Sequence, residues 1–189
     1  VEREFLTQDE LKRLEEKQIG ISRLEQVRDI FLFCCLTGLA YVDVASLSTE
    51  NIVEGKRGRQ WLRKARNKTN NMCNIPLLRP ALRILEKYAE YRAATGRLLP
   101  VPSNQKMNAY LKELATLCGV AKNLTTHCAR HTFATTVTLA NGASLENVSK
   151  MLGHSQIKTT QVYAETSPER VFRDVEKILP FITQYHLTN

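Results

Sequence analysis

The sequence lacks several features that would place it in other classes of protein. No apolar run reaches the roughly 18 residues that a membrane-spanning helix needs, and no signal peptide is visible. The five cysteines are odd in number, and Cys34 and Cys35 are neighbours within an apolar run, which does not fit a disulfide framework. Internal repeats and low-complexity linkers are also absent. We therefore expect a globular domain in a reducing compartment, the cytoplasm.

Acidic residues are scarce relative to basic ones. The chain of 189 residues has 19 Asp and Glu against 27 Lys and Arg, which gives a net charge of +8 and a pI of about 9.4. This excess favours a polyanionic partner, and nucleic acid is the commonest one. An inert basic surface would give the same charge, so charge alone does not decide. The length suits one good-sized domain, or at most two small ones, and the start at Val1 rather than Met predicts a piece of a longer protein.

Helical spacing and capping residues organise most of the chain. Thr7 and Glu10 form a capping box, in which each side chain can bond the backbone of the other residue. Thr126 is expected to cap the helix that follows it, and Ser155 the segment that holds Tyr163. Apolar periodicity, with glycine or proline near the expected ends, predicts helices over about residues 7–17, 22–36, 42–46, 80–94, 103–119, 126–141, 144–152 and 171–179.

The pattern changes between residues 51 and 77. Residues 60–65 and 72–77 are short extended runs, and the polar loop 66–71 joins them, which predicts a small antiparallel sheet. Lys56 and Arg57 lie in a turn just before it, so the segment 56–68 is strongly basic. This segment fits either a DNA contact or a solvated surface. The predicted fold class is a single domain that is mainly α with a small antiparallel sheet (α+β).

Four polar residues near the C-terminal end suit phosphodiester chemistry. His127 and Arg130 stand three apart, so a helix presents both on one face. His154 and Tyr163 follow in the next segments. A guanidinium meets a phosphate in two parallel bonds, an imidazole moves protons near neutral pH, and an activated phenol oxygen can attack phosphorus. The set therefore fits cleavage of a phosphodiester without a metal. His131, by contrast, fits a structural role in the core.

The segments around these residues resemble the C-terminal motifs of the tyrosine recombinases, the phage integrase family. The matching stretches are His127-x-x-Arg130-His131-Thr-Phe-Ala-Thr, then Leu152-Gly153-His154-Ser155, then Thr159-Thr160-x-x-Tyr163. Thr37-Gly38-Leu39 resembles the first motif of the family, and Lys68 resembles its hairpin lysine. The similarity therefore spans nearly the whole chain.

This resemblance implies the tyrosine-recombinase catalytic-domain fold and its activity, DNA integration and recombination. Members cut double-stranded DNA through a 3′-phosphotyrosyl link and rejoin it to another strand, without cofactor or metal. It implies Tyr163 as nucleophile, Arg130, His127 and His154 around the phosphate, and Lys68 as acid for the leaving 5′ oxygen. It also implies dimers or tetramers on DNA. We expect residues 1–189 to be a catalytic fragment without the N-terminal DNA-clamping domain, with residues 171–189 placed to contact a neighbouring protomer.

One position departs from the family pattern. The residue after Thr37-Gly38-Leu39 is an arginine in most members, the first of two that clamp the phosphate, but here it is Ala40. In this respect the chain resembles the integrases of Bacteroides-type mobile elements, which also lack that arginine. Arg28, a charge on an otherwise apolar helix, is the first candidate to replace it, and Arg66 is the second. A surface position or a salt bridge to an aspartate is the structural alternative for Arg28.

Other classes of function remain open from the sequence. Residues 144–165 superficially fit a helix-turn-helix, and Ala40 suits a recombinase fold that binds DNA but has lost catalysis. A type IB topoisomerase shares the chemistry, although its motif spacing fits less well. His127 and His131 imitate a zinc pair, but Cys128 replaces the glutamate of HExxH, so we expect no metal. The residues expected to contact DNA outside the catalytic set are Arg66, Lys56, Arg57 and Lys158.

Overall fold

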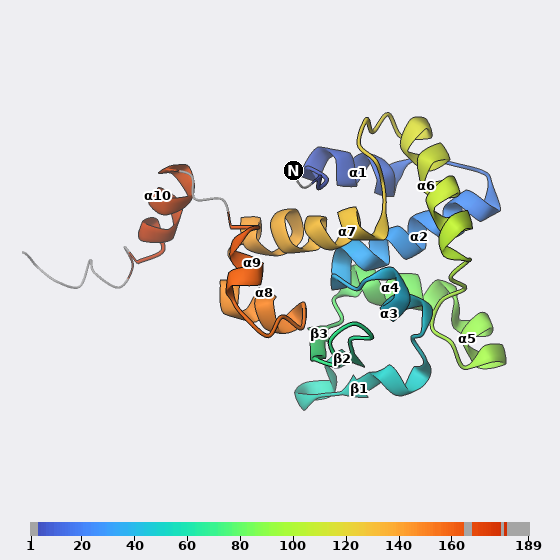
Figure 1. Ribbon diagram of the computed structural model, residues 1–189, viewed down its shortest axis with the longest axis horizontal. Coiled ribbons are helices and arrows are strands. Elements are labelled where there is room, and N and C mark those ends of the chain that lie inside the picture. Colours follow the sequence, from blue (N-terminus) through green and yellow to red (C-terminus); the bar gives the residue numbers. More distant parts are fainter. Residues whose placement is uncertain (1–3, 165–167, 179, 181–189) are drawn as a thin grey trace, which may run out of the picture.

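The computed structural model describes residues 4–164, 168–178 and 180. Helices make up most of this part of the chain, and a small sheet lies below them in Figure 1. The helices are α1 (Gln8–Glu16), α2 (Ser22–Thr37), α3 (Tyr41–Ala45), α4 (Arg79–Lys87), α5 (Ala89–Thr95), α6 (Asn104–Leu117), α7 (Thr126–Thr132), α8 (Leu145–Met151), α9 (Lys158–Gln161) and α10 (Pro168–Glu176). The predicted fold class is confirmed. None of the helices in the described ranges is both long and apolar enough to cross a bilayer.

Helix α2 forms the centre of the fold because apolar residues surround its axis. Phe31 and Phe33 are both fully buried, although they lie on different sides of the helix. Helices α4, α6 and α7 all contact α2, as a helix that is apolar on every side requires. The helix ends at Gly38, whose backbone N–H donates to the carbonyl of Cys34 at 2.8 Å. Helix α2 thus leads directly into the Thr37-Gly38-Leu39 motif.

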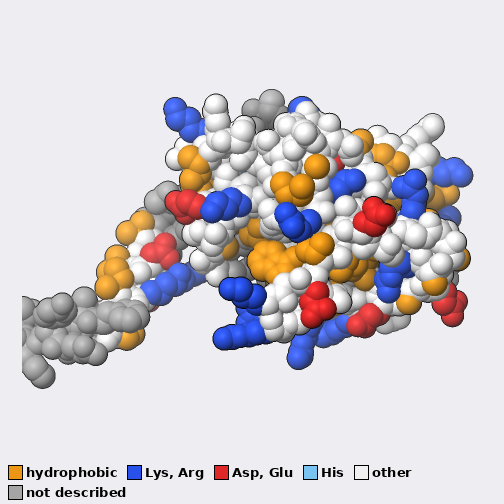
Figure 2. All heavy atoms as spheres, turned by 90° about the horizontal axis from the view of Figure 1, so that it is seen from below, with side chains coloured by type: hydrophobic (Ala, Val, Ile, Leu, Met, Phe, Trp, Pro, Cys, Tyr) orange, Lys and Arg blue, Asp and Glu red, His pale blue; other side chains and the backbone are white. Residues whose placement is uncertain are grey.

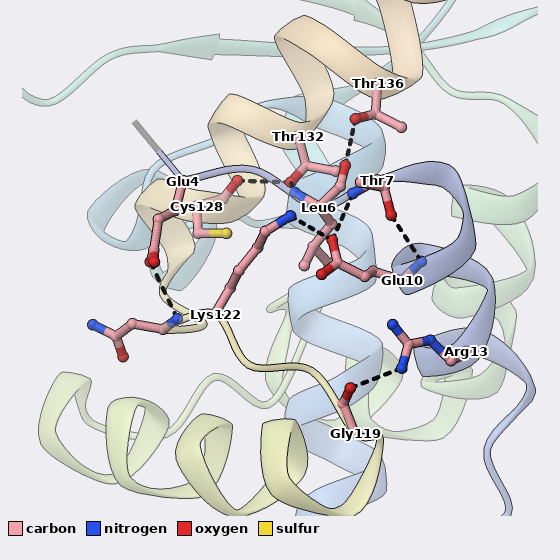
Figure 3. A network of polar contacts seen from close by, with 11 residues as sticks. Glu4, Leu6, Thr7, Glu10, Arg13, Gly119, Lys122, Cys128, Thr132 and Thr136 are labelled. Atoms are coloured by element: carbon pink, nitrogen blue, oxygen red, sulfur yellow. Dashed lines mark hydrogen bonds and ion pairs between the residues drawn. The ribbon is translucent and has the colours of Figure 1, made fainter. Parts of the chain in front are cut away.

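The N-terminal segment is fastened to α7 and to the loop that precedes it (Figure 3). The backbone N–H of Leu6 donates to the hydroxyl of Thr132 at 2.9 Å, and the hydroxyl of Thr136 donates to the carbonyl of Leu6. Lys122 Nζ lies 2.6 Å from Glu10 Oε2, within the capping box that the sequence predicts. These bonds join the N-terminal segment to residues more than 100 positions later in the chain and hold α7 in place.

The sheet has three antiparallel strands in the order β1-β2-β3. They are β1 (Ile52–Glu54), β2 (Gln60–Ala65) and β3 (Met72–Pro76), with η2 (Lys56–Gly58) between β1 and β2. Trp61 pairs with Pro76 and Ala65 with Met72, so the turn 66–71 closes the hairpin as predicted. Strand β1 was not predicted, because its three residues are too few to give a periodic signal in the sequence. Helix α8 packs beside β3.

The single helix predicted over 126–141 is divided into three parts. Helix α7 continues as the π-helical η3 (Phe133–Thr138) and ends in the 3₁₀-helical η4 (Leu139–Asn141). The hydroxyl of Thr138 donates to the carbonyls of Phe133 and Ala134, and that of Thr135 donates to His131. Side-chain hydroxyls that bond nearby carbonyls compete with the regular ladder, which accounts for the wider turn.

Three further expectations about the helices were wrong. Thr125, rather than Thr126, caps α7, and its hydroxyl accepts from the N–H of Cys128 at 3.0 Å. Ser155 does not cap the next segment, because α9 begins after Ile157. The helix predicted over 80–94 is also split at Tyr88 into α4 and α5, and the Tyr88 hydroxyl donates to Asp29 on α2 at 2.8 Å.

Candidate active site

Arg130 stands at the centre of the site and is held by two motifs that are distant in sequence. Its Nη1 donates to the carbonyl of Gly38 at 2.6 Å, and its Nη2 donates to the carbonyl of Leu152 at 2.7 Å. Nη2 also lies 3.1 Å from Nε2 of His154. The end of α2 and the end of α8 therefore meet on one guanidinium, which is 4% exposed.

The charge of Arg130 is not neutralised by an ion pair within the described residues. Burial, together with the nearby charge of Arg66, lowers the pKa of Arg130 to about 10, so it stays protonated at neutral pH. Its three bonds use three of the five N–H groups of a guanidinium. Among the described residues, two donors are left for another acceptor. A buried cation with spare donors is a suitable clamp for a phosphate.

His154 is held as a neutral imidazole in one tautomer. Burial, followed by the charges of Arg130 and Arg66, lowers its pKa to about 4. A guanidinium only donates, so Nε2 of the neutral ring accepts from Arg130. Nδ1 then carries the proton and donates to the hydroxyl of Thr160 at 2.8 Å. The ring thus links α9 to Arg130 and leaves the positive charge on the guanidinium.

Tyr163 belongs to a row of three aromatic rings. The rings of His127 and His131 are 4.2 Å apart between centroids, and those of His131 and Tyr163 are 5.2 Å apart. His127 is exposed at the outer end of the row, while Tyr163 is 8% exposed and packs in a small apolar cluster. Tyr163 also lies close enough to Arg130 for its phenol to influence the pKa of the guanidinium. The proposed nucleophile and the proposed clamp therefore share one site.

The turn of the β2–β3 hairpin brings Arg66 to the same place. The aliphatic part of Arg66 lies over Gly153, where a Cβ would come within 2.9 Å of its Cδ. Arg66 Nε is buried and has no hydrogen-bond partner in the described structure. The next residue, Asn67, donates from its backbone and its side chain to Asp43 Oδ1 at 2.9 and 3.1 Å. Asp43 on α3 is 1% exposed, so a buried carboxylate fastens the turn.

Arg28 does not join this group. Its Nη1 donates to the carbonyl of Lys17 at 2.5 Å, and its Nε lies 4.0 Å from Asp29 Oδ1. It precedes Gly38 on α2, and with a rise of 1.5 Å per residue the two are about 15 Å apart along the helix. The structure therefore brings Arg66, and not Arg28, to Arg130. The ion pair of Arg28 with its neighbour matches the structural alternative.

The remaining basic residues lie outside the centre of the site. Lys68 is in the exposed turn beyond Arg66. Lys56 and Arg57 are exposed in η2, which is at the opposite end of β2 from that turn, roughly 20 Å away for a strand of this length. Lys56 and Arg57 are therefore near Lys68 in the sequence but distant from it in the structure. Lys158 is exposed on α9, the helix that carries Thr160.

Sequence reasoning missed the supporting residues of the site. Thr160 fixes the tautomer of His154, Asp43 and Asn67 fasten the hairpin, and the ring of His131 lies between two proposed catalytic rings. A buried aspartate on the short apolar α3 was the one local signal, because such a charge needs a partner. The described residues contain no group of three or more His, Cys, Asp or Glu arranged to bind a metal.

Comparison with known protein families agrees with this geometry. Residues 4–170, which include every motif named above, match the Phage integrase family. The chain belongs to the phage integrase family. Within it, the tyrosine recombinase XerD of Rhizobium meliloti (strain 1021) is 33% identical over 159 residues, covering 78% of this chain and 50% of the relative. The XerD of Oceanobacillus iheyensis (strain DSM 14371 / CIP 107618 / JCM 11309 / KCTC 3954 / HTE831) is 30% identical over 184 residues and is covered to 59%. This integrase-family chain thus spans little more than half the length of these relatives.

Solved structures of the family share the fold. The catalytic domain of bacteriophage HP1 integrase gives a TM-score of 0.64 at 20% identity, covering 93% of this chain and 95% of that one. The XerH site-specific recombinase, in a post-cleavage complex with a palindromic difH substrate, gives 0.71 at 16% identity, covering 92% and 52%. The integrase-family fold of this chain is therefore that of a tyrosine-recombinase catalytic domain.

Proposed function

We propose that this chain is the catalytic domain of a site-specific tyrosine recombinase that cuts and rejoins double-stranded DNA in the cytoplasm. The observation that carries the proposal is the unpaired charge of Arg130, buried beside Tyr163 and anchored by both outer motifs. Such a guanidinium stabilises the charge that builds on the non-bridging oxygens during attack at phosphorus. Family membership, the net charge of +8 and five free cysteines support the same assignment.

In the proposed reaction, the phenol oxygen of Tyr163 attacks the scissile phosphorus and gives up its proton. The bond from phosphorus to the 5′ oxygen breaks, and that oxygen leaves with the electron pair and takes a proton from Lys68. The product is a 3′-phosphotyrosyl ester and a free 5′-hydroxyl, and attack by another 5′-hydroxyl reverses the step on a new strand. We assign to His127 contact with the phosphate or transfer of the phenol proton, and its exposed position in the ring row that includes Tyr163 supports this assignment.

Arg66 is proposed as the guanidinium that replaces the missing arginine at position 40. Its Nε is buried without a partner, and its charge acts on both Arg130 and His154. Two like charges held this close favour an anion between them. Lys56, Arg57 and Lys158 then contribute exposed charge for more distant DNA contacts, which weaken with rising salt. The first assignment, Arg28, is left with a structural role in this proposal.

The finer kinship proposed here is with the integrases of Bacteroides-type mobile elements. The support is Ala40 in the segment Thr37-Gly38-Leu39-Ala40-Tyr41, because those integrases also lack the arginine. We further propose that the protein assembles on DNA as a dimer or tetramer and that α10 contacts a neighbouring protomer. Val171, Phe172 and Val175 on α10 are all more than half exposed, which supports such a contact. The rest of the expected contact segment, residue 179 and residues 181–189, lies outside the described residues.

The proposal is tested by trapping the covalent intermediate. The protein is incubated with a nicked duplex that carries the recombination site of the element, so that the cleaved strand diffuses away. We expect a protein–DNA adduct that survives SDS and is absent in Tyr163→Phe. DNA binding without an adduct in the parent protein would instead support the second candidate, a DNA-binding module, which Ala40 favours.

The same assay separates the two arginines. Arg66→Ala is expected to reduce the rate of adduct formation about 100-fold or more, as the loss of one preorganised donor does in other active sites. Arg28→Ala is expected to leave that rate within a few-fold of the parent at a temperature where both are folded. A large loss of rate in Arg28→Ala with a small loss in Arg66→Ala would assign the phosphate-binding role to Arg28 instead.

A further inference from the structure

A groove of about 690 Å³ starts at the active site and runs between α8 and the outer face of the β2–β3 hairpin. His154 of the active site lines it together with Gly153, and Trp61, Met72 and Met151 supply apolar surface. On the face that carries the sheet, hydrophobic side chains gather near the middle of the molecule, with Lys and Arg side chains close by (Figure 2). The groove is therefore continuous with the place proposed for the scissile phosphate.

The side chain of Trp61 is held in one position in this groove by its neighbours. It pairs with Pro76 across the hairpin, and its indole packs on Gly55, where a Cβ would come within 2.7 Å of Nε1. A glycine at position 55 thus makes room for the ring. The ring is only partly buried and contributes to the wall of the groove. A rigid, half-covered indole next to an active site is a surface on which another flat ring can stack.

The polar groups along the groove match the edges of a nucleobase. The Nδ2 of Asn71 donates a hydrogen bond to the carbonyl of Gly153 at 3.1 Å, which leaves its Oδ1 free to accept from a ligand. The Oδ1 of Asn74 accepts a hydrogen bond from Arg63 Nε at 3.1 Å, which leaves its Nδ2 free to donate to a ligand. Lys150 is the charged side chain at the rim, and the described residues that line the groove include no carboxylate. Acceptor, donor and positive charge are thus combined with an aromatic wall.

We propose that this groove receives one unstacked base of the DNA next to the scissile phosphate, with Trp61 against its face. The proposal rests on the proposed function, because the DNA must first lie across Arg130. Extruding a base costs free energy, least where the base is mispaired, and stacking on an aromatic side chain offsets part of that cost. The groove therefore makes the protein favour sites whose base pair beside the cut is weak. A peptide segment is disfavoured as occupant because the groove shares His154 with the proposed phosphate site and because Lys150 is the one charged residue among the described residues that line it.

The test uses the fact that Trp61 is the one tryptophan of the chain. Tyr163→Phe protein is titrated with the recombination-site duplex in three forms: fully paired, mispaired beside the cut, and abasic at that position. Trp61 emission and the anisotropy of labelled DNA are recorded together. We expect the mispaired duplex to bind about 5- to 100-fold more tightly than the abasic one and to quench Trp61, whereas the abasic duplex leaves the emission unchanged.

Two variants complete the experiment. Trp61→Ala should bind the mispaired and abasic duplexes equally, and Trp61→Phe, which keeps an aromatic face, should retain part of the preference. Leu78→Ala, at an exposed apolar residue outside the groove, should behave as the parent. DNA binding with the same Trp61 emission for all three duplexes would overturn the groove assignment and leave the proposed function standing. Quenching that rises with protein concentration without DNA would assign the groove to a second copy and also overturn it. Failure to bind any duplex would overturn both.

Discussion

At the scale of single residues, Gly38 shows how closely the site is joined to the core. Its φ of 71° is the left-handed conformation, and a Cβ there would lie 2.5 Å from Phe133 Cδ1 and 2.8 Å from Leu152 Cδ2. Its carbonyl also accepts the bond from Arg130. Gly38, two residues before Ala40, thus ends α2, packs against two other elements and holds Arg130. Glycine is needed there for conformation and for space together.

We predict that Gly38→Ala destabilises the protein by about 3 kcal/mol or more, because it combines a strained φ with a clash in a packed interior. Gly96→Ala is the matched control. Gly96 has nearly the same φ of 72° but no atom within 4 Å of a Cβ, so it should cost only about 1 kcal/mol. Urea unfolding of the two variants measures the difference. Equal losses would mean that the crowding at Gly38 is relieved without cost.

His154 gives a prediction about pH. Its pKa is about 4 in the folded protein against an ordinary value of 6.5, so between these values the unfolded chain binds more protons than the folded one. The free energy of unfolding should therefore fall as pH drops from 6.5 towards 4. The contribution is on the order of 1 kcal/mol once the partial exposure of the ring is allowed for. His154→Gln, which does not titrate, should unfold with a weaker dependence on pH over this window. An unchanged pH dependence would show that the folded ring titrates normally.

At the scale of elements, Asn67 joins the β2–β3 turn to α3. The side chain of Asn67 donates to Asp43 Oδ1 and to the carbonyl of Val42 at 3.1 and 3.2 Å. Asn67→Ala should lower the free energy of unfolding by about 0.5–1.5 kcal/mol. It should slow adduct formation by much more than this loss implies, because the turn carries Arg66 and Lys68. Thr69→Ala, in the same turn, serves as control in single-turnover assays. Equal rates for the two variants would remove the positioning role from Asn67.

The elements also show what local sequence can predict. The capping box at Thr7, the helix that carries Arg130 and the hairpin were predictable, because each depends on residues close together in the chain. Which of Arg28 and Arg66 lies near Arg130 was not predictable, since it depends on Gly153 packing against the hairpin turn. The π-helical η3 also makes a contact that the local sequence does not reveal. Thr136 bonds Leu6, which is near the other end of the chain.

At the scale of the whole molecule, the site lies where two apolar clusters meet. Ala129 belongs to the large cluster around α2, while Phe133, Leu152 and Tyr163 belong to a smaller one. Arg130 lies between them in sequence, and its bonds reach both.

Because the smaller cluster buries less apolar surface, its backbone should open more easily. We expect amide hydrogens in 145–163 to exchange faster than those of α2. Equal protection would mean that both clusters unfold as one unit.

Helix α10 extends the molecule beyond these clusters, and it stands apart from the body in Figure 1. Its described contacts are polar, with Arg173 Nη1 3.4 Å from the carbonyl of Ala140. Phe172 and Val175, by contrast, are 67% and 55% exposed. A surface helix with a bare apolar face is expected to bury it against another molecule. Under the proposed assembly of several copies on DNA, a second protomer is the simplest partner.

We therefore predict that the double variant Phe172→Ser, Val175→Ser forms fewer dimers or tetramers on DNA and keeps the unfolding midpoint of the parent. Loss of two large apolar contacts should weaken each protomer contact by about 2–4 kcal/mol, roughly 30- to 1,000-fold. Sedimentation of the protein with recombination-site duplex measures the effect. Leu117→Ser, at an exposed apolar residue at the end of α6, should assemble normally. If the α10 variant assembled like the parent, the protomer contact would have to be made by another surface.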